Sequence, residues 1–342
     1  MRGPRDRVEA PLTRSRCFLC RRTFKDRART EEHIFPKWLQ RAFRLYNEGL
    51  VLLNRTSIPY RQLTVPCCEG CNKTLDRRLE RPMRDAVTNG YAAMKRLDPE
   101  IIFLWLAKMY YAVLLKEHFL RSSRKDPRRG PILRARRINE LNLLHTFLQV
   151  VLTPVSYDPY PPWSLFVLNV LKTDDVRLDF DFRDDFQRRF IAIRMGCVGL
   201  IAVLNDHGLT SDMMSEIRSV VGDNALHPVQ FVEVAAQVAY NESRRVRGFS
   251  YAVAEQDGQI RVTVLPSLSN RPFHDEFSLE RYARLLSMYQ NVSLSDVMPA
   301  PDVVRTLLHQ EDGTFRDIRL DELPVHPGEP LAPLRPLPRR MR

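Results

Sequence analysis

The sequence predicts an α+β protein in which a small cysteine-containing module precedes a larger domain of mixed helices and strands. Three observations support this class. Two Cys-x-x-Cys pairs enclose residues 17–71, which indicates a module held together by a metal. A long apolar segment of helical length comes next, and the short apolar segments after it, separated by turn residues, are typical of strands. The chain of 342 residues is long enough for two hydrophobic cores.

The composition divides the chain into four predicted parts. Residues 1–16 hold Arg and Pro without hydrophobic periodicity, and we expect a flexible basic arm there. The cysteine-containing module is expected over 17–90, and an α+β domain of unassigned role over 91–322. Residues 323–342 contain a proline at about every third position, so we expect a proline-rich basic tail that is extended or disordered.

Helices and strands are assigned from periodicity and turn residues. The module is expected to end in a helix that begins near Asn72 and is bent or ended by Pro82. An apolar helix is expected over 101–120, where the charges at 116–118 favour a buried core helix over a membrane span. Further helices are expected over 138–151, 211–221 and 278–290, and strands over 163–171, 190–204, 248–254 and 259–265, the last two joined by a hairpin turn at Asp257 and Gly258.

Positive charge is concentrated in the N-terminal part of the chain. The net charge is +12, and residues 1–90 alone hold twenty Lys and Arg against ten Asp and Glu. Residues 121–137 add eight positive charges against one negative charge. Because neutralising phosphates releases condensed counterions, this clustering favours a nucleic-acid partner, DNA with RNA as the alternative. The competing interpretation is an arginine-rich surface that is only solvated.

Residues 1–16 lack the apolar segment of a signal peptide, and no apolar run in the sequence is long enough to span a bilayer. We therefore expect a cytoplasmic protein that makes no membrane contact. An oligomer is compatible with the sequence.

The cysteines are arranged as metal ligands. Cys17 and Cys20 form one pair, Cys68 and Cys71 form another, and 47 residues separate them. Four thiolates at this spacing predict a tetrahedral structural Zn²⁺ site, with iron as a less suitable occupant. Cys67 is an alternative to Cys68 as a ligand, although the Cys-x-x-Cys spacing favours Cys68. Buried or redox-active cysteines without a metal are the competing interpretation.

A second pattern lies between and after the cysteine pairs. The stretch "EHIFPK" places a carboxylate directly before a histidine, and "CEGCNKTLD" follows the second pair with an Asn that opens a helix. In this order, the motifs resemble the HNH endonuclease family, the ββα-metal nucleases, in its zinc-stabilised form. The resemblance covers about residues 17–80 and implies an N-terminal zinc-stabilised ββα-metal module. It also extends loosely to uncharacterised bacterial HNH proteins, some of which lie near defence or mobile elements.

The resemblance implies roles for individual residues. His33 matches the general base, and its ordinary pKa leaves much of it neutral at pH 7. Glu32 and Asn72 match ligands of a catalytic cation, with Glu in place of the usual Asp, and Asp76 lies one helical turn after Asn72. An all-oxygen set of this kind predicts Mg²⁺ or Mn²⁺ as a second, catalytic metal.

The middle residue of the motif is an Asn that orients the base. Asn54 is the candidate for this catalytic role, and Gln62 is the substitute. Four basic residues on or near the helix after the second cysteine pair are candidates for binding the nucleic-acid backbone: Lys73, Arg77, Arg78 and Arg81.

Structural interpretations compete with these roles. His33 could be a core histidine bonded to a carbonyl group, Asn72 could cap the helix that follows it, and Asp76 could belong to a surface ion pair. The basic residues could simply be solvated. Trp38 is expected to pack beneath the motif.

The sequence therefore predicts a metal-dependent DNA endonuclease that hydrolyses phosphodiester bonds with a His base and one Mg²⁺-type cation. The alternative is a non-catalytic zinc protein that binds nucleic acid through its arginines. A cysteine-based redox protein is the third hypothesis.

Overall fold

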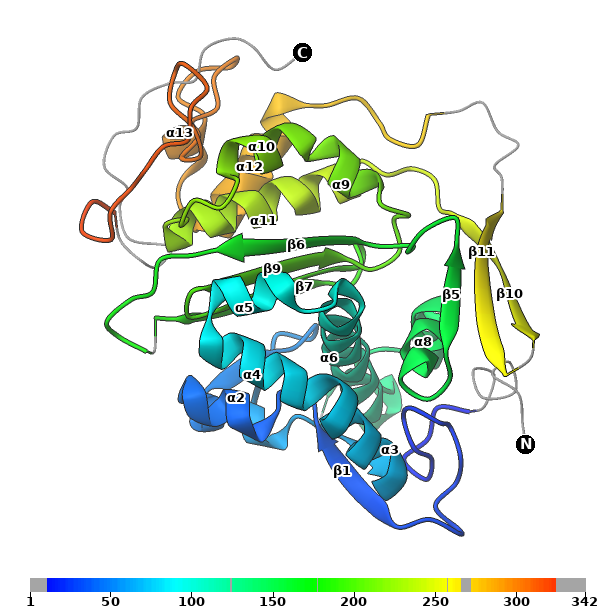
Figure 1. The fold of residues 1–342 in the computed structure, drawn as a ribbon. Helices are drawn as coiled ribbons and strands as arrows, with labels where there is room; N and C mark the ends of the chain where they lie inside the picture. The colour runs from blue at the N-terminus through cyan, green and yellow to red at the C-terminus, as the bar shows by residue number, and fades with distance from the viewer. Residues whose placement is uncertain (1–10, 124, 177, 257, 266–271, 324–342) are drawn as a thin grey trace. The chain divides into compact units, whose positions relative to one another are not determined.

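A computed structural model describes residues 11–123, 125–176, 178–256, 258–265 and 272–323 (Figure 1). The chain is α+β and divides into two compact units. The first comprises Met1–Asn89, Arg96–Tyr160 and Tyr251–Leu265, and the second comprises Gly90–Lys95, Pro161–Ser250 and Pro266–Arg342. The expected tail over 324–342, most of the N-terminal arm and Asp257 of the expected hairpin lie outside the described residues.

A two-stranded sheet and a helix form the centre of the cysteine-containing region. Strand β1 (Arg29–His33) pairs antiparallel with β4 (Thr64–Cys68), so that His33 lies opposite Thr64 and Arg29 opposite Cys68. Helix α3 (Glu69–Leu75) begins directly after β4 (Figure 1). The segment between the two strands contains helix α2 (Lys37–Ala42), the short hairpin of β2 (Gly49–Val51) and β3 (Ser57–Pro59), and two single-turn helices, η1 (Leu45–Asn47) and η2 (Tyr60–Gln62).

The helix predicted to be bent or ended at Pro82 continues through it. The π-helical segment η3 (Asp76–Glu80) joins α3 to α4 (Arg81–Asn89). A proline ring clashes with the carbonyl group four residues earlier in a regular α-helix. The wider π-turn, in which the Arg81 amide donates to the Asp76 carbonyl five residues earlier, provides the room for Pro82.

The long helix α6 (Pro99–Phe119) confirms the predicted apolar helix. It begins after Asp98, whose side chain accepts a hydrogen bond from the Glu100 amide, and fifteen of its residues are buried. No helix in the described residues is long and apolar enough to span a membrane. The rest of this unit consists of η4 (Pro127–Arg129), α7 (Ala135–Asn139), α8 (Asn142–Leu148), η5 (Gln149–Val151), and a sheet in the order β10 (Ser250–Gln256), β11 (Gln259–Leu265), β5 (Val155–Asp158).

The second unit is a helical layer on a four-stranded antiparallel sheet (Figure 1). The sheet order is β6 (Ser164–Asn169), β9 (Val198–Val203), β8 (Phe190–Met195), β7 (Phe180–Asp185). The helices on one side of the sheet are α9 (Leu209–Met213), α10 (Ser215–Val221), α11 (Pro228–Ser243), α12 (Leu279–Gln290) and α13 (Leu294–Val297) (Figure 1). The short helix α5 (Tyr91–Arg96) lies on the other side.

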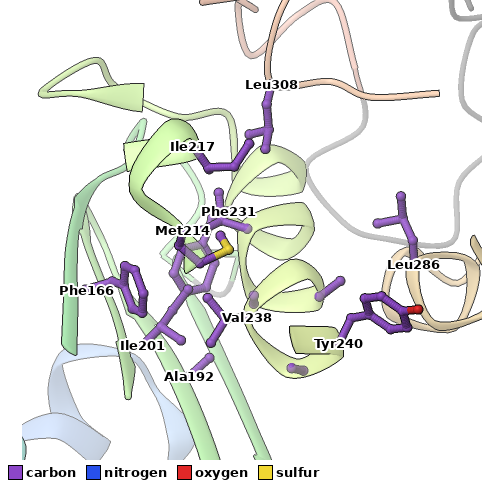
Figure 2. Close-up of a cluster of buried hydrophobic side chains, with 14 of the residues drawn as sticks. Phe166, Ala192, Ile201, Met214, Ile217, Phe231, Val238, Tyr240, Leu286 and Leu308 are labelled. Carbon is purple, nitrogen blue, oxygen red and sulfur yellow. The ribbon is translucent and has the colours of Figure 1, made fainter. Parts of the chain in front are cut away.

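The core of this unit lies between the sheet and α11. Phe166 and Ile201 of the sheet, Phe231 and Val238 of α11, and Leu286 of α12 belong to one buried hydrophobic cluster (Figure 2). The contact between β9 and α11 needs a glycine, because a Cβ atom at Gly199 would meet the Phe231 ring at 2.7 Å. Close helix–sheet packing at this point therefore depends on the absence of a side chain.

The single strand expected over 190–204 is two strands. β8 and β9 form a hairpin around Gly196, which has a positive φ of 60°. Every residue of both strands is buried, so their continuous apolar pattern hides the turn between them. The other predicted strands and the helix ending at Gln290 agree with the structure to within a few residues.

The compact units also differ from the predicted boundary near residue 90. Helix α6 and the sheet of β5, β10 and β11 belong to the same unit as the cysteine-containing region. The physical reason is the set of buried contacts that α6 makes with β1 and η3, described below.

Candidate metal centre and adjoining site

Four cysteine side chains meet in the first unit. The Sγ atoms of Cys17, Cys20, Cys68 and Cys71 all lie within 4.8 Å of one another, and all four residues are buried. In the described part of the chain, this is the one group of three or more His, Cys, Asp or Glu residues placed to hold a metal ion. The two pairs, distant in sequence, therefore form one site that could bind a metal such as zinc.

Local backbone structure brings the pairs together. The first pair lies in a turn in which the Arg21 amide donates to the Cys17 carbonyl at 3.0 Å, and Arg21 adopts a positive φ of 57°. This turn is joined to β4 by a 2.8 Å hydrogen bond from the Phe18 amide to the Pro66 carbonyl. The second pair spans the start of α3, with Cys68 at the N-cap and Cys71 in the first turn.

The four thiols alter one another's ionisation: the pKa values of Cys17, Cys20 and Cys71 are raised, and only that of Cys68 is lowered. Hydrogen bonding from the Cys17 thiol, and from Cys20 and Cys71, holds the pKa of Cys68 far below its ordinary value. The pKa of Cys71 is raised, chiefly by its hydrogen bond with Cys17. Four thiolates this close repel one another strongly, whereas Zn²⁺ coordinated by four thiolates removes that penalty. The sulfur donor set and the closed, buried position fit structural zinc, with no coordination position left for substrate.

Cys67 lies beside this group but outside it. Its Sγ atom is 3.9 Å from Cys17 Sγ and 3.5 Å from the Cys68 carbonyl oxygen. Of the two alternatives left open by the sequence, the structure groups Cys68 with the other ligands.

His33 ends strand β1 next to the buried carboxylate of Glu32. Side chains alternate along a strand, so Thr30 and Glu32 share one face of β1 and His33 takes the other. Glu32 is buried and His33 is half-buried. Burial, with the nearby charges of Lys37 and Lys108, lowers the pKa of His33, which keeps the imidazole neutral at pH 7.

Glu32 belongs to a buried charge network. Lys108 of α6 is 0% exposed, and its Nζ atom lies 2.8 Å from Glu32 Oε1 and also donates to Glu80 Oε1. The indole Nε1 atoms of Trp38 and Trp105 each lie 3.1 Å from Glu80 Oε2. Burial favours the neutral form of Lys108, but the two carboxylates outweigh it and raise the Lys108 pKa. One ammonium group thus joins β1 to η3 through α6.

Asn72 faces β1, and Asp76 is paired with an arginine. The Asn72 carboxamide donates to Thr30 Oγ1 at 2.9 Å, which places Asn72 on the same side of the sheet as Glu32. Cys68 occupies the N-cap of α3, so the capping role considered for Asn72 does not occur. Asp76 accepts a 2.8 Å hydrogen bond from Arg81, the surface ion pair that competed with its role as a ligand. The predicted roles of Asn72 and Asp76 as Mg²⁺ or Mn²⁺ ligands stay predictions.

The structure does not bring Asn54 beside His33. The Asn54 side chain accepts hydrogen bonds from Thr56 at 3.1 and 2.7 Å and donates to the Ser122 carbonyl at 3.3 Å. The neighbouring Leu53 amide contacts Glu117 of α6, nine residues or about 13 Å along the helix axis from Lys108. Gln62 lies nearer the motif, since it immediately precedes Leu63, whose carbonyl accepts from the Ile34 amide at 2.9 Å.

The residues predicted to bind the nucleic-acid backbone differ in the protein groups that their side chains already contact. Arg78 donates to the Val150 and Val151 carbonyls at 3.1 and 2.9 Å, which gives its guanidinium a structural role. Lys73 pairs with Glu69 on the exposed surface. Arg77 is exposed, as is Arg81 beside Asp76. These residues keep their nucleic-acid role as a prediction.

Sequence reasoning assigned no role to Glu80, Trp105 or Lys108. The sequence does indicate that Lys108 has a partner, because a lysine in the middle of the apolar helix expected over 101–120 must be buried with one. The identity of that partner was not available, because Glu32 and Glu80 lie 76 and 28 residues away in sequence.

Comparison with known proteins adds no assignment: no family model, no curated protein and no solved structure matches the chain.

Proposed function

We propose that the first unit contains a zinc-stabilised phosphodiesterase module of the HNH type, which cleaves DNA with His33 as general base. One observation carries the proposal. Strands β1 and β4 form an antiparallel pair that is followed directly by helix α3, and the four-cysteine group lies at the start of this helix. His33 lies at the end of β1, while Asn72 of α3 contacts Thr30 of the same strand.

The proposed chemistry uses the imidazole of His33, whose lowered pKa suits a general base. Its neutral imidazole would take a proton from water, and the resulting hydroxide would attack phosphorus as the P–O bond to the leaving oxygen breaks. A bound Mg²⁺ or Mn²⁺ would neutralise charge on the phosphate oxygens, with Glu32, Asn72 and Asp76 as its oxygen donors. The Lys108 network would keep Glu32 in place while the exposed Arg81 leaves Asp76 at small cost.

The test is nicking of supercoiled plasmid by the full chain with Mg²⁺ or Mn²⁺. The proposal expects nicking by the native protein and its loss in His33→Ala. His118→Ala is the matched control, because His118 lies at the C-terminal end of α6 and contacts the Leu133 carbonyl. Zinc content measured on both variants verifies that the module is intact. Equal nicking by His33→Ala and the native protein would reject His33 as the base.

A second candidate function has its own support. Glu32 and Asp76 each already have a cationic side-chain partner, which favours a zinc module that binds nucleic acid without cleaving it. That function predicts DNA binding that weakens with salt and no nicking with either cation. The same plasmid experiment, paired with a binding assay, separates the two functions.

A further inference from the structure

Two segments of the first unit that are distant in sequence meet at the tip of the β2–β3 hairpin. The Asn54 carboxamide donates a hydrogen bond to the Ser122 carbonyl at 3.3 Å. Arg55 directly follows Asn54, Arg121 directly precedes Ser122, and both arginines are exposed. The fold thus brings the start of the basic run over 121–137, to which the proposed nuclease site assigns no role, beside the segment that joins β1 to β4.

The cationic side chains at this meeting point lack carboxylate partners. Residues 121–129 hold five Lys and Arg against one Asp. That carboxylate, Asp126, pairs with the two arginines at the end of the segment at 3.2 and 3.7 Å. Within the described ranges of the chain, Arg55, Arg121 and Lys125 form neither an ion pair nor a side-chain hydrogen bond, and all three are exposed. Cations placed in this way are available to the phosphates of a polyanion.

Apolar side chains are exposed at the same tip. Val51, the last residue of β2, is 67% exposed, and Leu53, which directly precedes Asn54, is 53% exposed. Leu52 between them is buried. Two large aliphatic side chains two positions apart therefore face solvent beside the unpaired cations. Exposed apolar side chains concentrated in this way are typical of an interaction surface.

Backbone hydrogen bonds hold the tip in place. The turn is closed by the Leu52 amide, which donates to the Thr56 carbonyl at 2.8 Å, and by the Arg55 amide, which donates to the Leu52 carbonyl at 2.8 Å. The Leu53 amide donates to the Glu117 carboxylate of α6 at 2.7 Å. The tip is therefore preorganised, and a rigid element loses less conformational entropy on binding. The Asn54 carboxamide makes no DNA contact in this arrangement, because Thr56 and Ser122 already use it.

Duplex DNA is the occupant that this combination suits best. Proteins that bind the minor groove insert apolar side chains between base steps, while Arg and Lys contact the phosphates on either side. A single strand is less suitable, because strand-binding sites stack bases on aromatic rings and residues 51–57 contain none. A membrane surface is also less suitable, because it usually takes the broad apolar face of an amphipathic helix rather than a hairpin tip.

We propose that the tip of the β2–β3 hairpin and the loop that begins at Arg121 form a second contact with duplex DNA. Leu53 and Val51 enter the minor groove, and Arg55, Arg121 and Lys125 bind the phosphates. This inference rests on the proposed function, for which it supplies a binding surface apart from the proposed base. The α6 residue that holds the tip lies about 13 Å along the helix axis from Lys108, a distance of about four base pairs in B-DNA.

The test is binding of a short fluorescent DNA duplex to the full-length His33→Ala chain, measured by anisotropy at several salt concentrations without added divalent cations. Arg121→Gln in this background should weaken binding about tenfold, in line with the loss of one charged hydrogen bond. It should also lower the salt slope by about one, because one phosphate contact is lost. Leu53→Ser should weaken binding about tenfold and leave the salt slope unchanged, because it removes only an apolar contact.

Each variant has a matched control in the second unit. Arg319→Gln removes an exposed arginine that pairs with Asp321, and Met288→Ser removes an apolar side chain that is 74% exposed. Both controls should bind the duplex like the parent chain. Equal unfolding temperatures across the set verify that the substitutions act on the surface and leave the fold intact.

A nicking assay separates this inference from the proposed function. If the native chain nicks plasmid, Arg121→Gln should raise the plasmid concentration needed for half-maximal rate and leave the maximal rate unchanged. Weakened binding by Arg121→Gln in a chain that never nicks would remove the nuclease proposal and keep this surface. Nicking by the native chain together with unchanged duplex binding in Arg121→Gln and Leu53→Ser would remove this surface alone.

Three further results would overturn the proposal. One is unchanged duplex affinity in the double variant Arg55→Gln and Arg121→Gln. Another is tighter binding of a single-stranded oligonucleotide or of duplex RNA than of duplex DNA. The third is binding of anionic lipid vesicles that duplex DNA does not displace and that Leu53→Ser abolishes.

Discussion

The Lys108 ammonium group lies 2.8 Å from a carboxylate oxygen of Glu32 inside the first unit, and the lysine side chain is 0% exposed. Glu80 shares the same ammonium group, and Trp38 and Trp105 bind the other oxygen of Glu80. Glu32, which directly precedes the proposed base His33, is thus held by an ion pair with a residue 76 positions away in sequence. The cost of desolvating these groups is met only while all three charges remain together.

Lys108→Met should therefore destabilise the protein by about 3–5 kcal/mol, because it leaves two buried carboxylates without a cation. The measurement is the free energy of unfolding from urea titration. Lys73→Met is the control, since Lys73 forms an exposed pair with Glu69 and should cost less than about 1 kcal/mol. Similar losses in the two variants would contradict the buried network.

The cysteine cluster predicts about one zinc ion per chain. Cys71→Ser should remove that zinc and lower the unfolding temperature, because a zinc ion bound by the four cysteines would link the turn at Cys17 to α3. Zinc released by a thiol reagent and measured with a chromogenic chelator checks this outcome.

Cys67→Ala provides the matched control for the zinc experiment. Cys67 is buried beside the cluster but lies outside the group of four. This variant should keep its zinc and lose only the packing of one sulfur atom. Loss of zinc from Cys67→Ala, with retention in Cys68→Ser, would reverse the ligand assignment.

Asn54 is expected to act in folding rather than in orienting the base. Asn54→Ala removes hydrogen bonds to Thr56 and Ser122 and should cost about 1 kcal/mol of stability. If plasmid nicking is observed, its rate per folded molecule should be unchanged in this variant. A large loss of rate with unchanged stability would restore Asn54 to the catalytic role that the sequence predicts.

Gln62→Ala is the companion measurement. Gln62 is exposed and precedes Leu63, which binds the Ile34 amide next to His33. Loss of nicking in this variant alone would identify Gln62 as the residue that positions the base.

Glu233 of α11 predicts a pH dependence of stability in the second unit. Burial raises its pKa to about 7, although its carboxylate accepts a 2.8 Å hydrogen bond from the Leu307 amide and another from Thr306. Arg316 acts in the opposite direction to burial, and Tyr282 also lies within electrostatic reach. The folded protein therefore binds a proton at Glu233 more tightly than the unfolded chain does.

A raised pKa in the folded state stabilises the protein at low pH, and this contribution is lost as pH rises from the ordinary Glu value towards 7. Glu233→Gln should remove this part of the dependence, on the order of 3 kcal/mol between the two ends of the window. Urea unfolding of both proteins across the window measures the difference. Glu242 of the same helix also has a pKa raised to about 7 by burial, so residual dependence in the variant is expected. Identical slopes in the native protein and the variant would contradict the assignment to Glu233.

The sequence by itself determined the features that depend on neighbours along the chain. The spacing of Cys17, Cys20, Cys68 and Cys71 predicted the four-sulfur group. Apolar periodicity located α6 and α12 to within a few residues. Helix periodicity and the spacing inside each Cys-x-x-Cys pair are local properties, in which the deciding residues lie within a few positions of one another. The joining of the two pairs was predicted for a different reason, because a structural zinc ion needs four ligands and each pair supplies two.

Only the tertiary structure decided the features that depend on partners far away in sequence. It joined Lys108 to Glu32 and Glu80, placed Asn54 at a hairpin beside Ser122, and assigned α6 to the unit that contains the cysteines. It also gathered Arg188, Arg245 and Arg281, which lie on separate elements of the second unit, around one cleft. The physical reason is the cost of desolvation, because a buried charge is stable only when the fold brings an opposite charge within hydrogen-bond distance. The spacing of residues along the sequence does not predict which charges come that close.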